Sequence, residues 1–261
     1  MTDDDEVLSR RDGRVLRLTI NRPDRHNPLS RPVLARLAAE MTRAASDDAL
    51  ACVVIRGAGR RYFAAGGDLR DLDEVREPEA TREMALAARA ALDTVRQCPV
   101  PVVAMVNGDA IGGGGELAVA CDFRVMRAGA HIGYIHGRLN ISSAWGGGTD
   151  LCTLIGASRA LRMMARSELV PAATALAWGL ADEVADDDEA ALEAAVDAFI
   201  APMLRQRPQV IRAATAQARA RRNGEPSAAR RELELQHIVA TWSHADHLAA
   251  VDRFFGRSGG G

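Results

Sequence analysis

At 261 residues the chain is the size of one large domain, or of a domain with an appendage. Apolar residues make up 48% of it and the formal net charge is −2, a balance that excludes a disordered chain and gives no sign of a nucleic-acid-binding surface. Every basic residue is an arginine. Without lysine the chain has neither Schiff-base chemistry nor the lysine of a phosphate-binding loop.

Other features narrow the class further. No apolar run approaches the ~18 residues of a membrane span, and the first ten residues, "MTDDDEVLSR", are acidic, unlike a signal peptide. The four cysteines stand singly, with no spacing typical of a zinc or redox site, namely Cys52, Cys98, Cys121 and Cys152. We therefore expect a cytoplasmic protein with reduced, buried thiols, no bound metal, and neither nucleic acid nor membrane as a partner.

The predicted elements of the first half alternate between strands and helices. Apolar and polar residues alternate over 14–20, which predicts a strand with one buried face. The continuous apolar runs 51–57 and 100–108 predict strands that are fully buried. A helix is expected over 31–45, with Ser30 as its cap and Pro32 in its first turn, and another around 80–97. Short strands are expected at 123–126 and 131–135.

The second half is predicted to be mostly helical. The segment 146–166 has a helical pattern, and a further helix begins at Pro171 and ends at Gly179. From about residue 188 the pattern is helical throughout. We therefore expect an α/β core over residues 1–190 and a C-terminal helical region over 191–261.

The stretch "AIGGGGELAVACD" at 110–122 places four consecutive glycines directly before Glu116. Their spacing matches neither a dinucleotide-binding fingerprint nor a phosphate loop. A strand, a glycine loop and a helix together present backbone N–H groups to negative charge, but a glutamate in the first helical turn would repel a phosphate. The arrangement suits an enolate oxygen held by N–H groups, with the carboxylate aimed at a neighbouring carbon. A second loop of small residues, "FAAGGDL" at 63–69, is placed to supply another N–H.

Three motifs in this order resemble the crotonase (enoyl-CoA hydratase/isomerase) superfamily: "RYFAAGGDLRDL", "VPVVAMVNGDAIGGGGELAVACDFRVM" and "PAATALAWGLADEVA". The similarity extends from "LTINRPDRHNPLS" to near residue 186. It implies a spiral ββα core, a C-terminal helical region that forms trimers or dimers of trimers, and an acyl-CoA substrate that brings its own coenzyme A, so that no separate cofactor is needed.

The resemblance also implies roles for individual residues. The amides of Gly67 and Gly113 would form an oxyanion hole for the thioester carbonyl. Trp145 would pack over the acyl pocket, unless it simply fills core volume. The other residues implied to bind the substrate or its coenzyme A are Arg25, His26, Ala64, Ala65, Gly66, Asp68 and Leu69. For Asp68, capping a helix or pairing with an arginine is the alternative. Arg253 and Arg257 are further candidates for the coenzyme A phosphates, unless they simply end an amphipathic helix.

Hydratases of this family use two glutamates around a water molecule. Glu116 matches the first, but an ungapped alignment puts His136 where the second is expected. His136, separated by eight residues from "WGG" and with "ACDFRVM" upstream, resembles the pattern of the ethylmalonyl-/methylmalonyl-CoA decarboxylase branch. There the hole accepts the enolate left by departing CO₂, and His136 would orient the substrate carboxylate or move a proton.

Several interpretations stay open. Decarboxylation of a malonyl-type acyl-CoA is the first hypothesis; hydration through Glu116 and His136, or double-bond isomerisation, is the next. A non-catalytic acyl-CoA-binding protein is an alternative of another class. In that case Glu116 is a first-turn helix residue and His136 a structural one. The acyl group is not specified by the sequence.

Overall fold

The computed structural model describes residues 5–256 and contains a six-stranded sheet in the order β1-β2-β3-β5-β7-β10. The first two strands form an antiparallel hairpin and the remaining neighbours are parallel. The strands are β1 (Val7–Asp12), β2 (Val15–Ile20), β3 (Cys52–Gly57), β5 (Val102–Val106), β7 (Phe123–Arg127) and β10 (Glu183–Ala185). The α/β class expected from the sequence is confirmed.

A second, four-stranded sheet is built from strands of only three residues, in the order β4-β6-β8-β9. They are β4 (Tyr62–Ala64), β6 (Asp109–Ile111), β8 (His131–Gly133) and β9 (Leu169–Pro171). The first three each follow a strand of the large sheet, so the chain passes from β3 to β4, from β5 to β6 and from β7 to β8. Helices follow each pair, and this repeated strand-strand-helix turn is a ββα spiral.

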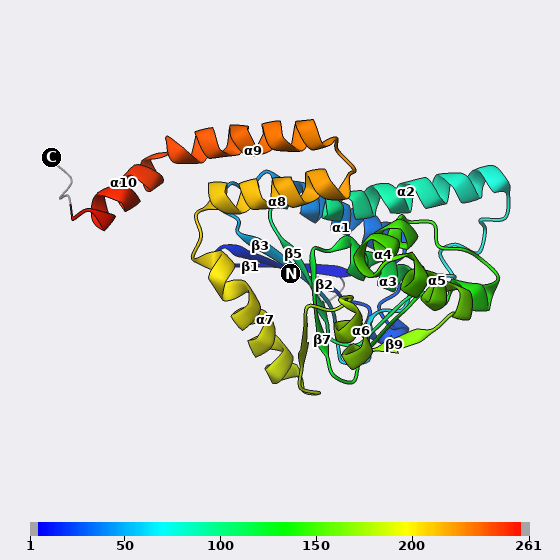
Figure 1. Ribbon diagram of the computed structural model, residues 1–261. Coiled ribbons are helices and arrows are strands. Elements are labelled where there is room, and N and C mark those ends of the chain that lie inside the picture. Colours follow the sequence, from blue (N-terminus) through cyan, green and yellow to red (C-terminus); the bar gives the residue numbers. More distant parts are fainter. Residues whose placement is uncertain (1–4, 257–261) are drawn as a thin grey trace.

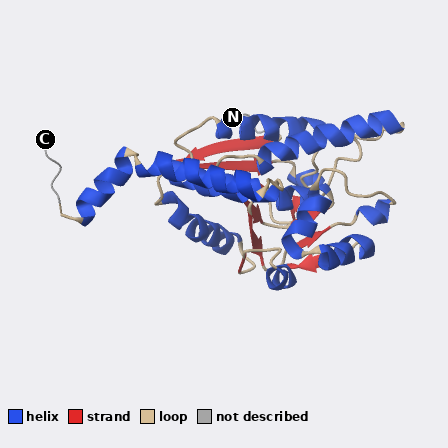
Figure 2. Cartoon of the chain, turned by 45° about the horizontal axis from the view of Figure 1, so that its top comes forward, coloured by secondary structure: helices blue, strands red, loops and turns tan. Residues whose placement is uncertain are grey.

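Helices cover both faces of the large sheet (Figures 1 and 2). On one face α1 (Arg31–Ala45), α2 (Pro78–Arg96) and α3 (Gly113–Ala120) enclose the main apolar core with both sheets. On the other face α7 (Glu189–Leu204) packs through Leu192, Val196 and Ile200 against alternate side chains of β2, β3, β5 and β7. The central strands read as continuous apolar runs because both of their faces are buried.

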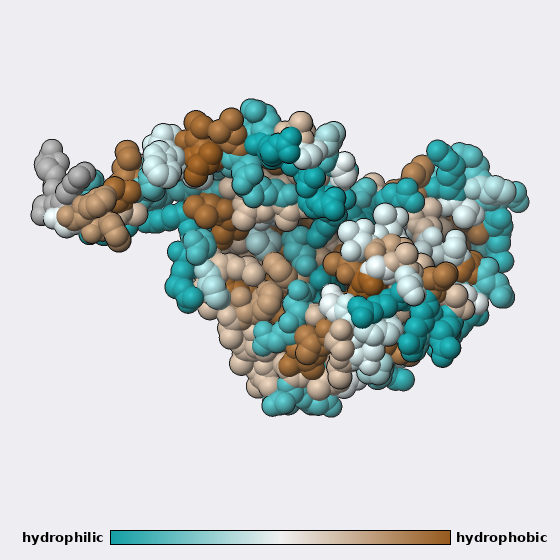
Figure 3. Space-filling view, in the orientation of Figure 1, coloured by the Kyte–Doolittle hydropathy of each residue, from teal (hydrophilic) through white to brown (hydrophobic). Residues whose placement is uncertain are grey.

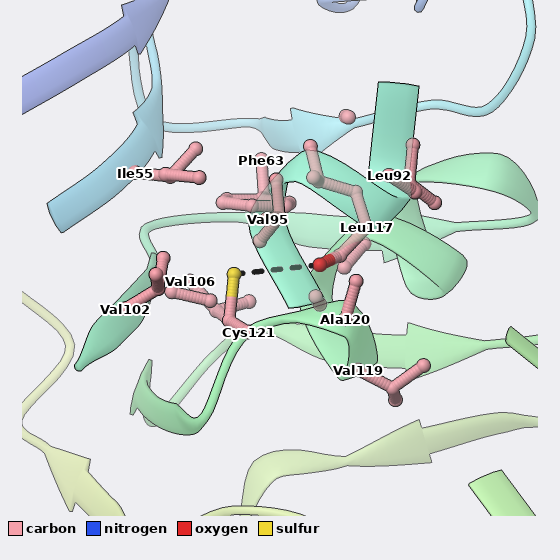
Figure 4. Close-up of a cluster of buried hydrophobic side chains, with 14 of the residues drawn as sticks. Ile55, Phe63, Leu92, Val95, Val102, Val106, Leu117, Val119, Ala120 and Cys121 are labelled. Carbon is pink, nitrogen blue, oxygen red and sulfur yellow. Dashed lines mark hydrogen bonds between the residues drawn. The ribbon is translucent and has the colours of Figure 1, made fainter. Parts of the chain in front are cut away.

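Figure 4 shows the part of the core around α3, where the Cys121 thiol donates to the carbonyl of Leu117 at 3.4 Å. Burial raises the pKa of Cys98 to about 11 and that of Cys121 to about 12. All four cysteines are free, and all except the half-buried Cys152 are buried. At neutral pH the buried thiols therefore stay protonated and pack as small apolar side chains.

The remaining helices follow the spiral. They are α4 (Gly147–Ile155), α5 (Ala157–Arg166), α6 (Ala172–Trp178), α8 (Pro208–Arg222), α9 (Ser227–Trp242) and α10 (Ala245–Phe254), with short 3₁₀ helices at Pro23–Arg25 and His136–Leu139. No helix within residues 5–256 combines the length and apolar character needed to cross a bilayer. The long helical stretch expected over 146–166 is interrupted at Gly156, whose φ of +79° ends α4 and starts α5.

The last two helices form an arm in which α9 runs back alongside α8 and α10 extends beyond the body of the molecule (Figure 1). Within the single chain neither α9 nor α10 has a fully buried residue among those described. Apolar side chains gather on this arm (Figure 3) and are largely exposed, namely Leu235, Ile238, Val239, Trp242, Leu248, Phe254 and Phe255. We call this set the arm surface.

Candidate active site

The two glycine loops predicted from the sequence lie side by side. They leave the carboxyl ends of β4 and β6, which are parallel neighbours in the small sheet. A Cβ added to Gly66 would lie 3.7 Å from the amide nitrogen of Gly113, so the two backbones are almost in contact. The first loop is fixed further by Leu29, whose amide donates to Gly66 O at 2.8 Å and whose carbonyl accepts from Asp68 N at 3.3 Å.

Two backbone amides are left without partners where these loops meet. Within the described chain, residues 5–256, neither Gly67 N nor Gly113 N has a hydrogen-bond acceptor. Gly113 is the first residue of α3, so its N–H is one of those that a helix leaves unsatisfied. Both glycines line a cavity of about 450 Å³, together with Glu116, His136 and Trp145. The cavity thus has two unpaired amide donors in its wall.

Glu116 is held rigidly beside these donors. It is only 1% exposed, and its Oε1 accepts hydrogen bonds from Trp145 N at 3.1 Å and from Gly147 N at 3.2 Å. Gly147 is pressed against it, since an added Cβ there would lie 2.5 Å from Glu116 Cγ. The loop after Ala144 therefore needs glycine at this point and clamps one oxygen of the carboxylate.

The other carboxylate oxygen faces His136. Glu116 Oε2 lies 3.5 Å from His136 Nε2, and the imidazole side chain is 13% exposed and lines the cavity. Tyr134 packs beside the imidazole and donates to Gly147 O at 2.9 Å. Burial, and next the charge of Glu116, raise the pKa of Tyr134 well above its usual value, so the phenol stays a neutral donor. A carboxylate and an imidazole thus form an acid–base pair beside the two amides.

Trp145 covers the place where the two amides meet. A Cβ added to Gly113 would lie 2.3 Å from Cζ3 of the indole, and one added to Gly67 would lie 3.4 Å from its Cζ2. The backbone of Trp145 is fixed on both sides, because its N–H donates to Glu116 and its carbonyl accepts from Arg96 at 2.9 Å. Arg96 is itself buried and paired with Asp150 at 2.7 Å.

The other sequence-predicted residues divide into two groups. Ala65, Gly66 and Leu69 line the cavity. Those that do not line it are Arg25, His26, Ala64 and Asp68. The loop of His26 still adjoins the first glycine loop, because His26 O accepts from Ala65 N at 3.1 Å. Their predicted contacts with coenzyme A stay predictions, as does that of the exposed Arg253; Arg257 lies outside the described residues.

Asp68 is occupied within the protein. Its carboxylate pairs with Arg22 at 2.8 Å, and both side chains are less than 10% exposed. Burial alone would raise the pKa of Asp68, but the hydrogen bond from Arg22 and further hydrogen bonds outweigh it and hold the pKa below its usual value. Asp68 therefore keeps its charge and ties the loop that carries Gly67 to the Arg22 loop.

Sequence reasoning missed part of the site. It did not find that the backbone of Trp145 and Gly147 binds Glu116, although the glycines at 146–148 were a visible signal of close approach. It also missed the apolar wall supplied by α2 and by the segment after His136, formed by Met84, Ala85, Leu139, Ile141 and Ala144. Within residues 5–256 no group of three or more His, Cys, Asp or Glu side chains is arranged to hold a metal ion.

The comparisons agree with this architecture. The sequence profile of the enoyl-CoA hydratase/isomerase family matches residues 10–258. The chain is 30% identical over 208 residues to a human ethylmalonyl-CoA decarboxylase, covering 79% of this chain and 67% of that protein. It is also 30% identical over 183 residues to a short-chain-enoyl-CoA hydratase of Clostridium acetobutylicum, covering 70% of each. An enoyl-CoA hydratase structure from Bacillus anthracis superposes with a TM-score of 0.89 at 26% identity, covering 97% of both chains.

The fold and the two glycine loops are those of the crotonase class of α/β proteins, which act on coenzyme A thioesters. The chain belongs to the enoyl-CoA hydratase/isomerase family. The resemblance inferred from the three motifs is thereby confirmed. Relatives named for decarboxylation and for hydration are matched at similar identity, so the comparisons leave the particular reaction open.

Proposed function

We propose that this enzyme decarboxylates a malonyl-type acyl-CoA. The observation that carries the proposal is the cavity in which two unpaired amides, Gly67 N and Gly113 N, stand beside a single buried carboxylate whose free oxygen faces an imidazole. Hydration by two glutamates requires a second carboxylate, and His136 stands in its expected place. The relatives named ethylmalonyl-CoA decarboxylase support the same choice.

The proposed reaction needs no activated water. The bond between the α-carbon and the substrate carboxylate breaks, and its electron pair moves through the α-carbon onto the thioester oxygen. The amides of Gly67 and Gly113 hold the resulting enolate oxygen, and each such donor is typically worth about 2.7–4 kcal/mol in the transition state. CO₂ leaves, and the α-carbon takes one proton from water to give the saturated acyl-CoA. His136 binds the departing carboxylate and is oriented by Glu116.

The test is a panel of thioesters followed by mass spectrometry. Ethylmalonyl-CoA and methylmalonyl-CoA should each lose the mass of CO₂, while crotonyl-CoA should gain no water at a comparable rate. Rapid hydration of crotonyl-CoA with the two malonyl-type substrates untouched would overturn the proposal. Tight binding of all three without turnover would favour the non-catalytic alternative.

Hydration is the second candidate, and one distance favours it. The 3.5 Å between Glu116 Oε2 and His136 Nε2 lets both groups reach one water molecule at the cavity wall. In that case Glu116 would act as the base that activates water and His136 as the group that exchanges a proton with the α-carbon. Both groups would then be indispensable, which separates this candidate from the first.

We also propose that the arm surface packs against neighbouring subunits in a trimer or a dimer of trimers. Its apolar side chains are largely exposed in the single chain, and Val239 is 61% exposed. Light scattering at micromolar concentration should give a mass of three or six chains, and Val239→Glu should shift the population towards the monomer. Leu161→Glu, on α5 and 63% exposed, is the matched control and should leave the mass unchanged. A wild-type monomer would contradict the proposal.

A further inference from the structure

A second cavity lies directly behind the first. It has a volume of about 350 Å³ and lies between α1 and α2, with Ala35, Ala87 and Ala90 of its lining exposed to solvent. Three residues line both cavities: Leu72, Met84 and Trp145. The two spaces are therefore separated only by side chains, with the indole of Trp145 as the largest of them.

The second cavity is chemically suited to a hydrocarbon chain. Its lining is mostly apolar. Leu29, Leu34, Ala88 and Ala91 are buried, whereas Ala35, Ala87 and Ala90 are exposed. The one charged residue in the lining, Arg31, pairs with Asp71 at 3.2 Å. No other charged side chain faces this space among the described residues.

Trp145 stands in a fixed position between the two spaces. Its indole lies beside both glycines whose amides are unpaired, since an added Cβ would be 2.3 Å from it at Gly113 and 3.4 Å from it at Gly67. Its backbone is held by Glu116 and Arg96, so the side chain cannot move aside with the loop. An acyl chain that starts at those amides and runs towards the α1–α2 space therefore meets the indole first.

We propose that Trp145, together with Met84, is the wall that restricts this enzyme to short acyl chains, and that the space between α1 and α2 is an extension of the acyl pocket that the indole blocks. The inference rests on the proposed use of the Gly67 and Gly113 amides to hold a thioester carbonyl. Removing the indole joins the two cavities and lets a longer hydrocarbon chain bury its end among the alanines of α1 and α2.

The experiment measures binding and is therefore independent of the reaction catalysed. Calorimetric titration with butyryl-CoA and decanoyl-CoA gives an affinity ratio for each protein. The wild type should favour butyryl-CoA. Each newly buried methylene raises affinity about fourfold, so Trp145→Ala should shift the ratio towards decanoyl-CoA by about tenfold or more. Trp145→Phe, which keeps an aromatic wall, should shift it far less.

Two further variants test the same wall independently, in case Trp145→Ala does not fold. Met84→Ala thins the same wall from a half-buried position on α2 and should shift the ratio in the same direction. Ala88→Leu fills the second cavity from α2; combined with Trp145→Ala, it should return the ratio towards the wild-type value. Circular dichroism establishes that each variant is folded.

The outcomes separate this inference from the proposed function. If folded Trp145→Ala and Met84→Ala keep the wild-type ratio while butyryl-CoA still binds, the wall inference is wrong and the proposed function is untouched. A wild type that prefers decanoyl-CoA also overturns the inference. If no protein in the series binds either thioester, both the proposed function and this inference are wrong.

Discussion

Gly67→Pro is expected to lower turnover about 10²–10³-fold, the usual effect of deleting one oxyanion-hole donor. Proline removes the N–H of Gly67, a residue that lines the cavity and whose amide has no acceptor among the described residues. Position 67 is a cleaner test than position 113, where any added Cβ would lie 2.3 Å from the indole of Trp145. At Gly67 the nearest atoms to an added Cβ are 3.4 Å away, an ordinary contact.

Gly67→Ala is the matched control, because it adds a Cβ and keeps the amide. We expect it to retain most of the wild-type kcat and to leave the loop in place. The measurement is steady-state kinetics on the substrate found in the thioester panel, with circular dichroism for each variant. A folded Gly67→Pro enzyme with full activity would show that this amide does not stabilise the transition state.

Glu116→Gln and His136→Ala are expected to affect different kinetic constants. For a decarboxylase, Glu116→Gln should keep substantial CO₂ release, because no carboxylate base is needed and the amide oxygen can still accept from Trp145 N and Gly147 N. His136→Ala should raise KM for the carboxylated substrate more than it lowers kcat. For a hydratase, either change should lower kcat about 10²–10⁴-fold.

The two variants are best measured together on one malonyl-type and one 2-enoyl thioester. Equal and large losses of hydration in both variants, with no CO₂ release by the wild type, would assign the pair to water activation. His136→Gln is a useful companion because it keeps a neutral hydrogen-bonding group. If it restores the KM lost in His136→Ala, the imidazole binds substrate through hydrogen bonding rather than through its charge.

Much of the fold could be predicted, because most elements have strong local signals. Ser30 caps α1 as expected, with its hydroxyl accepting from Val33 N, and the apolar runs at 52–57 and 102–106 are strands buried on both faces. The hairpin strand Val7–Asp12 was missed because its second half, "RRD", is charged and exposed, as an edge strand tolerates, and this hides any alternation. Strands of three residues, such as Tyr62–Ala64, carry too few positions to show any periodicity.

The candidate site was predictable only where it depends on the local backbone. The glycines before Glu116 indicate a helix N-terminus whose backbone amides are not covered by side chains. The structure places the unpaired amide of Gly113 there. The partners of Glu116 come from residues 29 and 31 positions further along, and such long-range contacts leave no periodic trace. The position of His136 was inferred from an alignment, but its 3.5 Å approach to the carboxylate depends on how two turns of the spiral stack.

Because the indole of Trp145 lies against both Gly67 and Gly113, the protein carries an optical reporter of its own site. A ligand at these amides changes the polarity around a fluorophore that is only 6% exposed, so its emission shifts in wavelength and intensity. Of the other two tryptophans, Trp242 is 64% exposed on the arm, and Trp178 lies beside the guanidinium groups of Arg159 and Arg162. Occupancy of the site can therefore be followed in real time without any label.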